Sequence, residues 1–194
     1  MKILHIAVSC FLQDRGGDGS IMANYEFNWD LIGDIEEGRE NLGTQVDVDV
    51  YRLMQFTLRD VIEQEMGTKK TDAIFFKAGK MAGFALYKNL IAPVDTLDEF
   101  VNKTQKILRE KKIGILRIEK MEEKEVVLTI DEDIDCSGLP ILDYETCVYD
   151  EGLVSALFEG FTGKPWNASE VDCWCTGART CRFQVIMTEE NASN

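Results

Sequence analysis

The chain has 194 residues, of which 45% are hydrophobic and 29% are charged, a balance typical of a globular protein with one sizeable core. Its formal net charge is −14 and its pI is near 4.5. Because nucleic-acid backbones are bound by clustered Lys and Arg, this acidic balance argues against a nucleic-acid-binding role.

The first 21 residues differ from the rest of the chain. The apolar run Ile3–Leu12 is far too short to span a membrane, and residues 13–20 have the composition of a flexible linker. We expect residues 1–21 to be an extension, or to precede a true start at Met22. Residues 22–188 are then one domain and residues 189–194 a tail, in a cytoplasmic protein that does not bind membranes.

The first half of this domain is predicted to be mainly helical. Residues 23–41 have alternating aromatic and polar side chains, as in a half-buried edge strand. Apolar residues at three- and four-residue spacing predict a helix over residues 49–66, closed by Gly67. Its apolar stripe fits either the core or a dimer seam, and we favour the core. In a second helix, Gly79 and Gly83 lie four residues apart, which indicates close packing against another backbone or a ligand.

The other elements follow in a simple order. They are the second helix itself over 72–90, with Ile74, Phe75, Ala78, Met81, Ala82, Ala85 and Leu86 inward, a capped helix over 96–111, a hairpin of 113–118 and 126–130, a solvated acidic loop over 131–135, a helix over 150–161 ending at Gly163, and a hairpin of 170–175 and 181–187. This order lacks a βαβ alternation, so it predicts an α+β fold in which an antiparallel sheet packs with helices.

Four of the six cysteines fall between residues 147 and 181. A hairpin centred on Gly177 places Cys173 and Cys181 on one face, and Cys147 precedes a helix whose N-terminus favours a thiolate. Such clustering indicates metal ligands in a reducing compartment, with Cys175 as one candidate for the fourth ligand. The alternative is a group of buried cysteines that act only as small apolar side chains.

The segments Glu170-Val171-Asp172-Cys173 and Cys181-Arg182-Phe183, with Gly177 between them and Cys147 upstream, resemble the 4-vinyl reductase domain family, also called hydrocarbon-binding proteins. Its relatives include the aromatic-sensing domains of phenol-responsive bacterial activators. Residues 74–83 resemble the family's Ala- and Gly-rich helix, and the similarity covers most of residues 23–188. The resemblance implies a ligand-binding domain of the 4-vinyl reductase and nitric-oxide-signalling type, and a Zn²⁺ ion bound by Cys147, Glu170, Cys173 and Cys181. Four protein ligands leave no position for a catalytic water, so this zinc would be structural.

The resemblance also implies an often dimeric domain with an apolar cavity between helices and sheet. We therefore expect a sensor or carrier of a hydrophobic or aromatic small molecule, a homodimer, and not an enzyme. Aromatic and methionine side chains are the candidate pocket walls, namely Phe75, Phe76, Met81, Phe84, Phe158, Phe161 and Trp166. A haem is not expected, because the only histidine, His5, lies outside the domain.

Two other functions stay open. Cys173, Cys175 and Cys181, with Cys136, could release a metal and form a disulfide under oxidant, which would make the domain a thiol redox sensor. An enzyme that reduces a tetrapyrrole vinyl group has less support, since no dinucleotide-binding glycine loop or general acid/base pair is visible.

Overall fold

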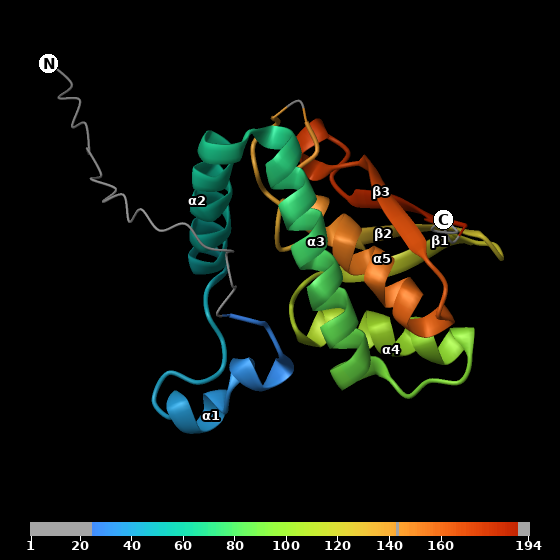
Figure 1. The fold of residues 1–194 in the computed structure, drawn as a ribbon, viewed down its shortest axis with the longest axis horizontal. Coiled ribbons are helices and arrows are strands. Elements are labelled where there is room, and N and C mark those ends of the chain that lie inside the picture. The colour runs from blue at the N-terminus through green and yellow to red at the C-terminus, as the bar shows by residue number, and fades with distance from the viewer. Residues whose placement is uncertain (1–24, 143, 190–194) are drawn as a thin grey trace, which may run out of the picture.

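The computed structural model describes residues 25–142 and 144–189 (Figure 1). The predictions for residues 1–21 lie outside this part of the chain, as do His5 and Cys10. The elements that build the domain are α2 (Val48–Met66), α3 (Thr68–Leu86) continued by a short π-helix (Tyr87–Ile91), α4 (Leu97–Glu110), β1 (Ile115–Met121), β2 (Glu125–Asp131), α5 (Val148–Thr162), β3 (Trp166–Asp172), a 3-10 turn (Trp174–Thr176) and β4 (Cys181–Met187).

The strands form one antiparallel sheet in the order β1-β2-β4-β3. Both predicted hairpins and the α+β class are therefore confirmed. Alternate residues of β2 and β4 are buried, such as Leu128 and Phe183, whereas the opposite face carries ion pairs such as that between Arg182 and Glu119. The sheet thus has one face in the core and one in solvent, as antiparallel sheets allow.

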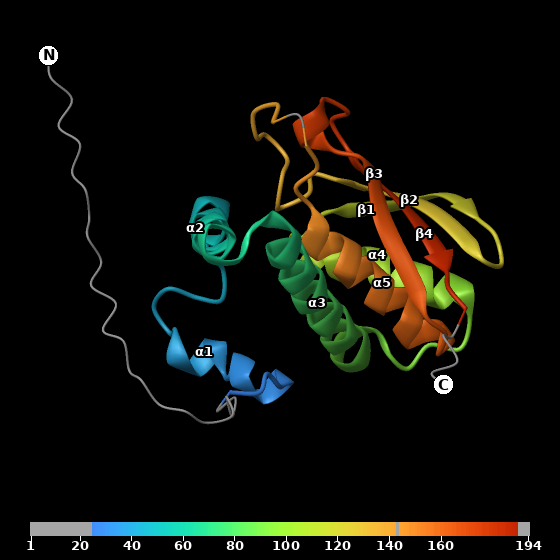
Figure 2. The ribbon, with the colours of Figure 1, turned by 45° about the horizontal axis from the view of Figure 1, so that its top comes forward.

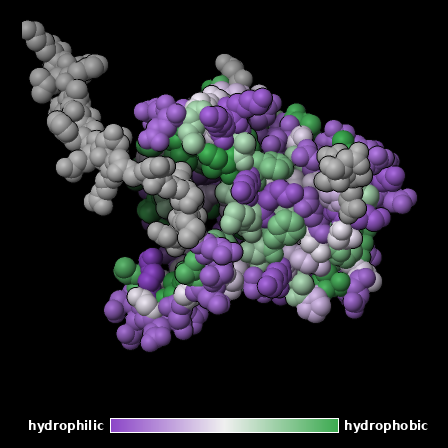
Figure 3. All heavy atoms as spheres, in the orientation of Figure 1, coloured by the Kyte–Doolittle hydropathy of each residue, from purple (hydrophilic) through white to green (hydrophobic). Residues whose placement is uncertain are grey.

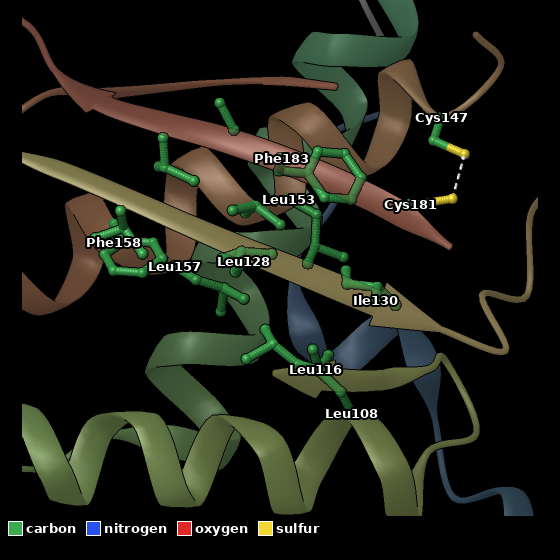
Figure 4. Packing of buried hydrophobic residues seen from close by; sticks show 14 of the residues in the cluster. Leu108, Leu116, Leu128, Ile130, Cys147, Leu153, Leu157, Phe158, Cys181 and Phe183 are labelled. Atoms are coloured by element: carbon green, nitrogen blue, oxygen red, sulfur yellow. Dashed lines mark hydrogen bonds between the residues drawn. The ribbon is translucent and has the colours of Figure 1, made fainter. Parts of the chain in front are cut away.

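Helices α4 and α5 cover the buried face, and α3 forms a further layer behind α5 (Figures 1 and 2). Figure 4 shows the core between them, where Leu153, Leu157 and Phe158 of α5 point toward the strands. Thr96 caps α4 by accepting a hydrogen bond from the Glu99 N–H at 3.2 Å, as the capping-box pattern predicts. Gly163 ends α5 with φ +68°, a left-handed conformation that glycine adopts without strain.

The contact between α3 and α5 is made backbone to backbone through glycines. A Cβ atom on Gly79 would lie 1.9 Å from the carbonyl oxygen of Tyr149, and one on Gly152 would lie 2.0 Å from that of Phe76. Gly83 faces Leu153 in the same way, at 2.4 Å. The prediction that Gly79 and Gly83 mark a close approach is confirmed, and the partner is the backbone of α5.

Sequence predictions for two segments were wrong in detail. Residues 29–38 form a 3-10 turn (Trp29–Ile32) and the short helix α1 (Ile35–Gly38) instead of an edge strand, because Asn28 and Asp34 accept N–H hydrogen bonds at their starts. On α3, Ile74 and Met81 are exposed, since the inward face runs through Thr71, Phe75, Gly79 and Gly83.

Helix α2 has the predicted bounds and ends at Gly67, but the prediction that it belongs to the core was wrong. None of its residues is buried within the described part of the chain. Its apolar stripe is exposed at Val50, Leu53, Met54, Leu58 and Val61. α2 stands apart from the layers in Figure 2 because the core is already closed by α3, α4 and α5.

Over the described ranges, 25–142 and 144–189, no helix combines the length and apolarity needed to cross a bilayer.

Candidate metal centre

Four buried cysteines converge at one end of the sheet. Cys136 lies in the loop after β2, Cys147 caps the N-terminus of α5, Cys173 follows β3, and Cys181 is the first residue of β4. Each is 0% exposed, and their sulfurs all lie within 4.8 Å of one another. Figure 4 shows the side chains of Cys147 and Cys181 pointing toward each other beyond the end of the hydrophobic core.

The sulfur separations are those of a tetrahedral site. Four sulfurs bound at about 2.3 Å to one zinc ion lie about 3.8 Å apart. The Sγ of Cys147 lies 3.7 Å from that of Cys181 and 3.9 Å from that of Cys173. The Sγ atoms of Cys136 and Cys181 are closer, at 3.0 Å. This cluster of cysteines has the donors and the spacing to bind a soft or borderline metal ion.

The packing of these thiols divides their acidities. Hydrogen bonds from Cys136, Cys147 and Cys181 lower the pKa of the Cys173 thiol. The thiol neighbours, first Cys136, raise the pKa values of Cys147 and Cys181. One thiolate held by its neighbours is the arrangement from which a metal displaces the remaining protons.

Glu170, the predicted fourth ligand, lies beside this cluster. Its Oε2 accepts a hydrogen bond from the Cys147 N–H at 3.4 Å, while its Oε1 is buried without a hydrogen-bond partner among the described residues. Burial, and then the charge of Cys173, raise the pKa of this carboxyl to about 9. Helix α5 positions Glu170, because the carboxylate of Glu151 accepts the Glu170 N–H at 2.7 Å.

The structure therefore brings together Cys147, Cys173 and Cys181, as the spacing predicts, and adds Cys136. The sequence analysis had placed Cys136 only among the redox cysteines, since it lies well before the other three. Cys175 is buried but lies outside the group of four, and its sulfur contacts the Thr146 hydroxyl at 3.4 Å. Burial raises its pKa to about 11.

The acidic segment 131–135 is not the solvated loop that its composition predicts. Asp133 and Asp135 are 1% and 2% exposed. Asp133 Oδ1 accepts the N–H groups of Asp135 and Cys136 at 2.7 and 3.3 Å, which turns the loop toward the cysteines. Burial raises the pKa of Asp133 to about 7. Asp150, in the first turn of α5, is 2% exposed and its pKa is raised by burial and by Asp133.

Helix α2 holds this loop from outside. Arg52 donates to the carbonyl oxygens of Ile134 and Ser137 at 2.7 and 2.8 Å, one on each side of Cys136. Tyr51 and Gln55 donate to the two carboxylate oxygens of Asp135 at 2.7 and 2.9 Å. An otherwise exposed helix is thus attached to the loop that carries one of the four cysteines.

A small apolar cavity lies between α4, α5 and β1, away from the cysteines. Its volume is about 10 Å³, room for about one water molecule. The wall is formed by Phe100, Val101, Thr104, Leu116, Ile118, Val154, Leu157 and Phe158. Thr104 Oγ1 is buried without a hydrogen-bond partner among the described residues. A wider hollow of about 890 Å³ lies between residues 29–51 and 110–112, but it is open and bounded by an exposed segment.

Of the seven predicted pocket residues, Phe158 lines this cavity. Phe161 stacks on Phe100 with ring centres 4.6 Å apart, and Trp166 packs on Phe158 at 5.4 Å. The four predicted residues on α3 do not line the cavity, and Met81 and Phe84 among them are exposed. These are Phe75, Phe76, Met81 and Phe84. The sequence had pointed to the aromatic residues of α3 and α5, whereas α4 supplies three of the residues that line the cavity.

Residues 126–187 match the family model of the 4-vinyl reductase domain. This chain contains a 4-vinyl reductase domain. The matched region holds all four clustered cysteines together with Glu170, Asp133 and Asp150. The predicted resemblance is confirmed, although the family match begins at β2 and not near residue 23.

Two relatives of this 4-vinyl reductase domain chain come from Methanocaldococcus jannaschii. The uncharacterized protein MJ0150 is 30% identical over 119 residues, which are 61% of this chain and 66% of that protein. The match therefore spans just under two thirds of that relative's length. The uncharacterized protein MJ1642 is 29% identical over 157 residues, 79% of this chain and 86% of that protein.

Solved structures share the fold at low sequence identity. The phenol-responsive sensory domain of the transcription activator PoxR, with phenol, has a TM-score of 0.60 at 12% identity and covers 77% of this chain and 79% of its own. A vinyl-4-reductase family protein from M. jannaschii has a TM-score of 0.55 at 14% identity and covers 79% and 88%. An H-NOX protein from S. oneidensis has a TM-score of 0.50 at 12% identity and covers 70% and 74%. The 4-vinyl reductase and nitric-oxide-signalling fold type is therefore confirmed.

Proposed function

We propose that this chain is a small-molecule-binding sensor or carrier domain for a hydrophobic or aromatic ligand, with a structural zinc ion that stabilises its fold. The observation that carries the proposal is the fold shared with the phenol-responsive domain of PoxR, together with an apolar cavity inside the core of this chain. Apolar cavities with few polar groups are the common form of ligand sites.

The cavity defines what the ligand must do. Its walls are apolar apart from Thr104, so it suits an apolar molecule with at most one hydroxyl group. At about 10 Å³ it is much smaller than the roughly 300–1,000 Å³ of typical ligand pockets. An aromatic ligand would therefore have to enlarge it, and a ligand that opens the core changes the structure, as a sensor requires.

Calorimetry with phenol tests this part of the proposal. We expect binding to the wild-type chain and stabilisation by about 2.7 kcal/mol at 100 times the dissociation constant. Val154→Phe fills the cavity and should abolish binding, whereas Val171→Phe at an exposed position should not. Phenol binding that Val154→Phe leaves unchanged would place the ligand elsewhere. A wild-type chain that binds neither phenol nor other small aromatic molecules would refute the ligand proposal.

The zinc ion is proposed to bind Cys147, Cys173 and Cys181, with Glu170 as the fourth ligand. The donor set fits this metal, since zinc takes thiolate and carboxylate ligands in tetrahedral geometry. The orphaned Oε1 of Glu170 beside the sulfurs supports the assignment, and Cys136 competes for the same position. A closed set of four protein ligands makes the metal structural.

Native mass spectrometry of protein purified without chelator tests the zinc site. The wild type should carry zinc, Cys147→Ser should lose it, and Cys175→Ser is the matched control that should keep it. Comparison of Glu170→Gln with Cys136→Ser identifies the fourth ligand. Purified wild-type protein without metal, which also fails to take up zinc, would remove the site from the proposal.

A homodimer is proposed through the exposed apolar faces of α2 and α3. Leu53, Met54 and Leu58 of α2 lie on the same side of the molecule as Ile74 and Phe84 of α3, and Figure 3 shows hydrophobic residues gathered over these helices. Exposed apolar stripes of this kind mark interaction surfaces. The heptad-like spacing on α2 favours a second copy of the same helix.

A thiol redox sensor remains a second candidate because of one distance. The Sγ atoms of Cys136 and Cys181 are 3.0 Å apart, close enough for a disulfide after a small movement. Peroxide would take up the two electrons from this thiol pair as the bond forms and any metal leaves. Zinc release by peroxide, with a disulfide that thiols reduce, would support this function, and a site inert to peroxide would exclude it.

A further inference from the structure

A second group of ligand atoms adjoins the cysteine cluster on the side of α5. Asp133 and Asp150 each offer a carboxylate oxygen, and these atoms and the Cys147 sulfur lie within 4.8 Å of one another. All three residues are buried, with 1%, 2% and 0% exposure. Cys147 thus belongs to two groups of candidate metal ligands at once.

Both carboxylates have an oxygen that is left without a partner. Oδ2 of Asp133 and Oδ2 of Asp150 are buried with no hydrogen-bond partner among the described residues. Asp133 uses its other oxygen to hold the loop, through the N–H groups of Asp135 and Cys136. Leaving a buried acceptor unpaired costs about 1–3 kcal/mol, and more if it is charged, so two such oxygens side by side call for a ligand.

The neighbouring Asp135 shows that this arrangement is particular to the two aspartates. It is equally buried, but Tyr51 and Gln55 hydrogen-bond to its two oxygens. Within the described residues no Lys or Arg forms an ion pair with Asp133 or Asp150. The nearby Arg52 donates to backbone carbonyls of the loop. Positive charge for these carboxylates has to come from outside the protein.

The donors around the cluster outnumber what one tetrahedral ion can use. Two four-coordinate ions that share one bridging ligand need seven donors. The buried end of the sheet offers a matching set: Cys136, Cys147, Cys173, Cys181, Glu170, Asp133 and Asp150. A second divalent ion would also offset two more of the negative charges that these groups carry when they bind metal.

We propose that Asp133, Asp150 and Cys147 form a second metal site, with Cys147 as a thiolate bridge to the first, so that the chain binds a pair of divalent ions. The mixed sulfur and oxygen donors select a borderline ion such as Zn²⁺ over Mg²⁺ or Ca²⁺, which prefer oxygen alone. This inference rests on the proposed zinc site only through the shared ligand Cys147.

Counting metal ions tests the second site. Metal-free protein is titrated with Zn²⁺ under reducing conditions, and bound ions are counted by native mass spectrometry. The wild type should bind two ions, while Asp133→Asn and Asp150→Asn should each bind one. Asp135→Asn is the matched control, a buried neighbour with both oxygens partnered, and it should still bind two.

Cadmium-113 NMR of the wild type gives a readout that needs no variant to fold. Two signals are expected, one from a sulfur-rich site and one from a mixed sulfur and oxygen site. A wild type that saturates at one ion with one signal would overturn the second site and leave the zinc proposal standing, with the two aspartates sharing a proton. Loss of an ion in Asp135→Asn would equally overturn it, because the aspartate effects would then be nonspecific. Failure to bind any ion would remove both sites.

Discussion

Replacing Gly79 by alanine tests the backbone contact between α3 and α5. The new Cβ would lie 1.9 Å from the carbonyl oxygen of Tyr149, where ordinary contacts are 3.4–4 Å, so the helices would have to separate by roughly 1.5 Å. The obstacle is backbone and cannot rotate away. Overpacking of this kind costs typically about 1–3 kcal/mol, and alanine returns about 1 kcal/mol of helix propensity. The expected net loss in the free energy of unfolding is about 2 kcal/mol.

Urea denaturation measures this loss. With a slope of about 1–3 kcal/mol per molar urea, a loss of about 2 kcal/mol lowers the midpoint by about 1 M. Gly38→Ala is the matched control, because nothing lies within 4 Å of its Cβ position and its effect should stay within about 0.5 kcal/mol. Tyr149 is two residues from Cys147, so Gly79→Ala should also weaken zinc binding.

The sign of the change decides the question. If α3 and α5 were not in backbone contact, Gly79→Ala would stabilise the chain by about 1 kcal/mol through propensity alone. A midpoint equal to or above that of the wild type would therefore refute the packing. Gly152→Ala clashes at the same contact, at 2.0 Å from the Phe76 oxygen. Once one alanine has parted the helices the second should cost less, so the double variant should lose less than the sum of the two.

Three further changes probe the surroundings of the two sites. Arg52→Ala removes hydrogen bonds to the loop around Cys136, worth about 1.5–3 kcal/mol, so amide exchange in α2 should accelerate, whereas exposed Lys69→Ala should leave it unchanged. Leu53→Glu places a charge on the exposed stripe of α2 and should shift a dimer to monomer in sedimentation experiments; a dimer of unchanged stability would exclude this face. Thr104→Val removes a buried hydroxyl without a partner and should raise the thermal stability by about 1 kcal/mol, while Thr71→Val, whose hydroxyl donates to Gly67, should lower it. A loss of stability in Thr104→Val would show that its hydroxyl has a partner.

Much of the fold could be predicted from local signals. Thr96, Gly67 and Gly163 end helices for reasons contained in a few neighbouring residues, and all three predictions are confirmed. Alternating apolar residues predicted the strands, because one face of an antiparallel sheet is buried. The same reasoning failed for α2, since a helical stripe does not reveal whether its partner lies in the same chain.

The cysteines could be assigned in part for a similar reason. Cys173 and Cys181 lie on one short turn between strands, and Cys147 follows from its place before a helix. Cys136 reaches them only because β2 pairs with β4, which aligns Ile130 with Cys181 and leads the following loop to the same end of the sheet. That pairing is a property of the folded sheet and has no signal in the spacing of the cysteines.

The acidic residues of the centre show where sequence reasoning stops. A run of aspartates is normally solvated, because burying a carboxylate costs several kcal/mol unless it is paired. Asp133 and Asp135 nevertheless lie in the interior, since one turns the loop toward the cysteines and the other is held by α2. A chain retains such a cost where something offsets it, and for Asp135 the hydrogen bonds of Tyr51 and Gln55 do so. For Asp133 and Asp150 the protein supplies no such group among the described residues, so a bound cation is the simplest compensation.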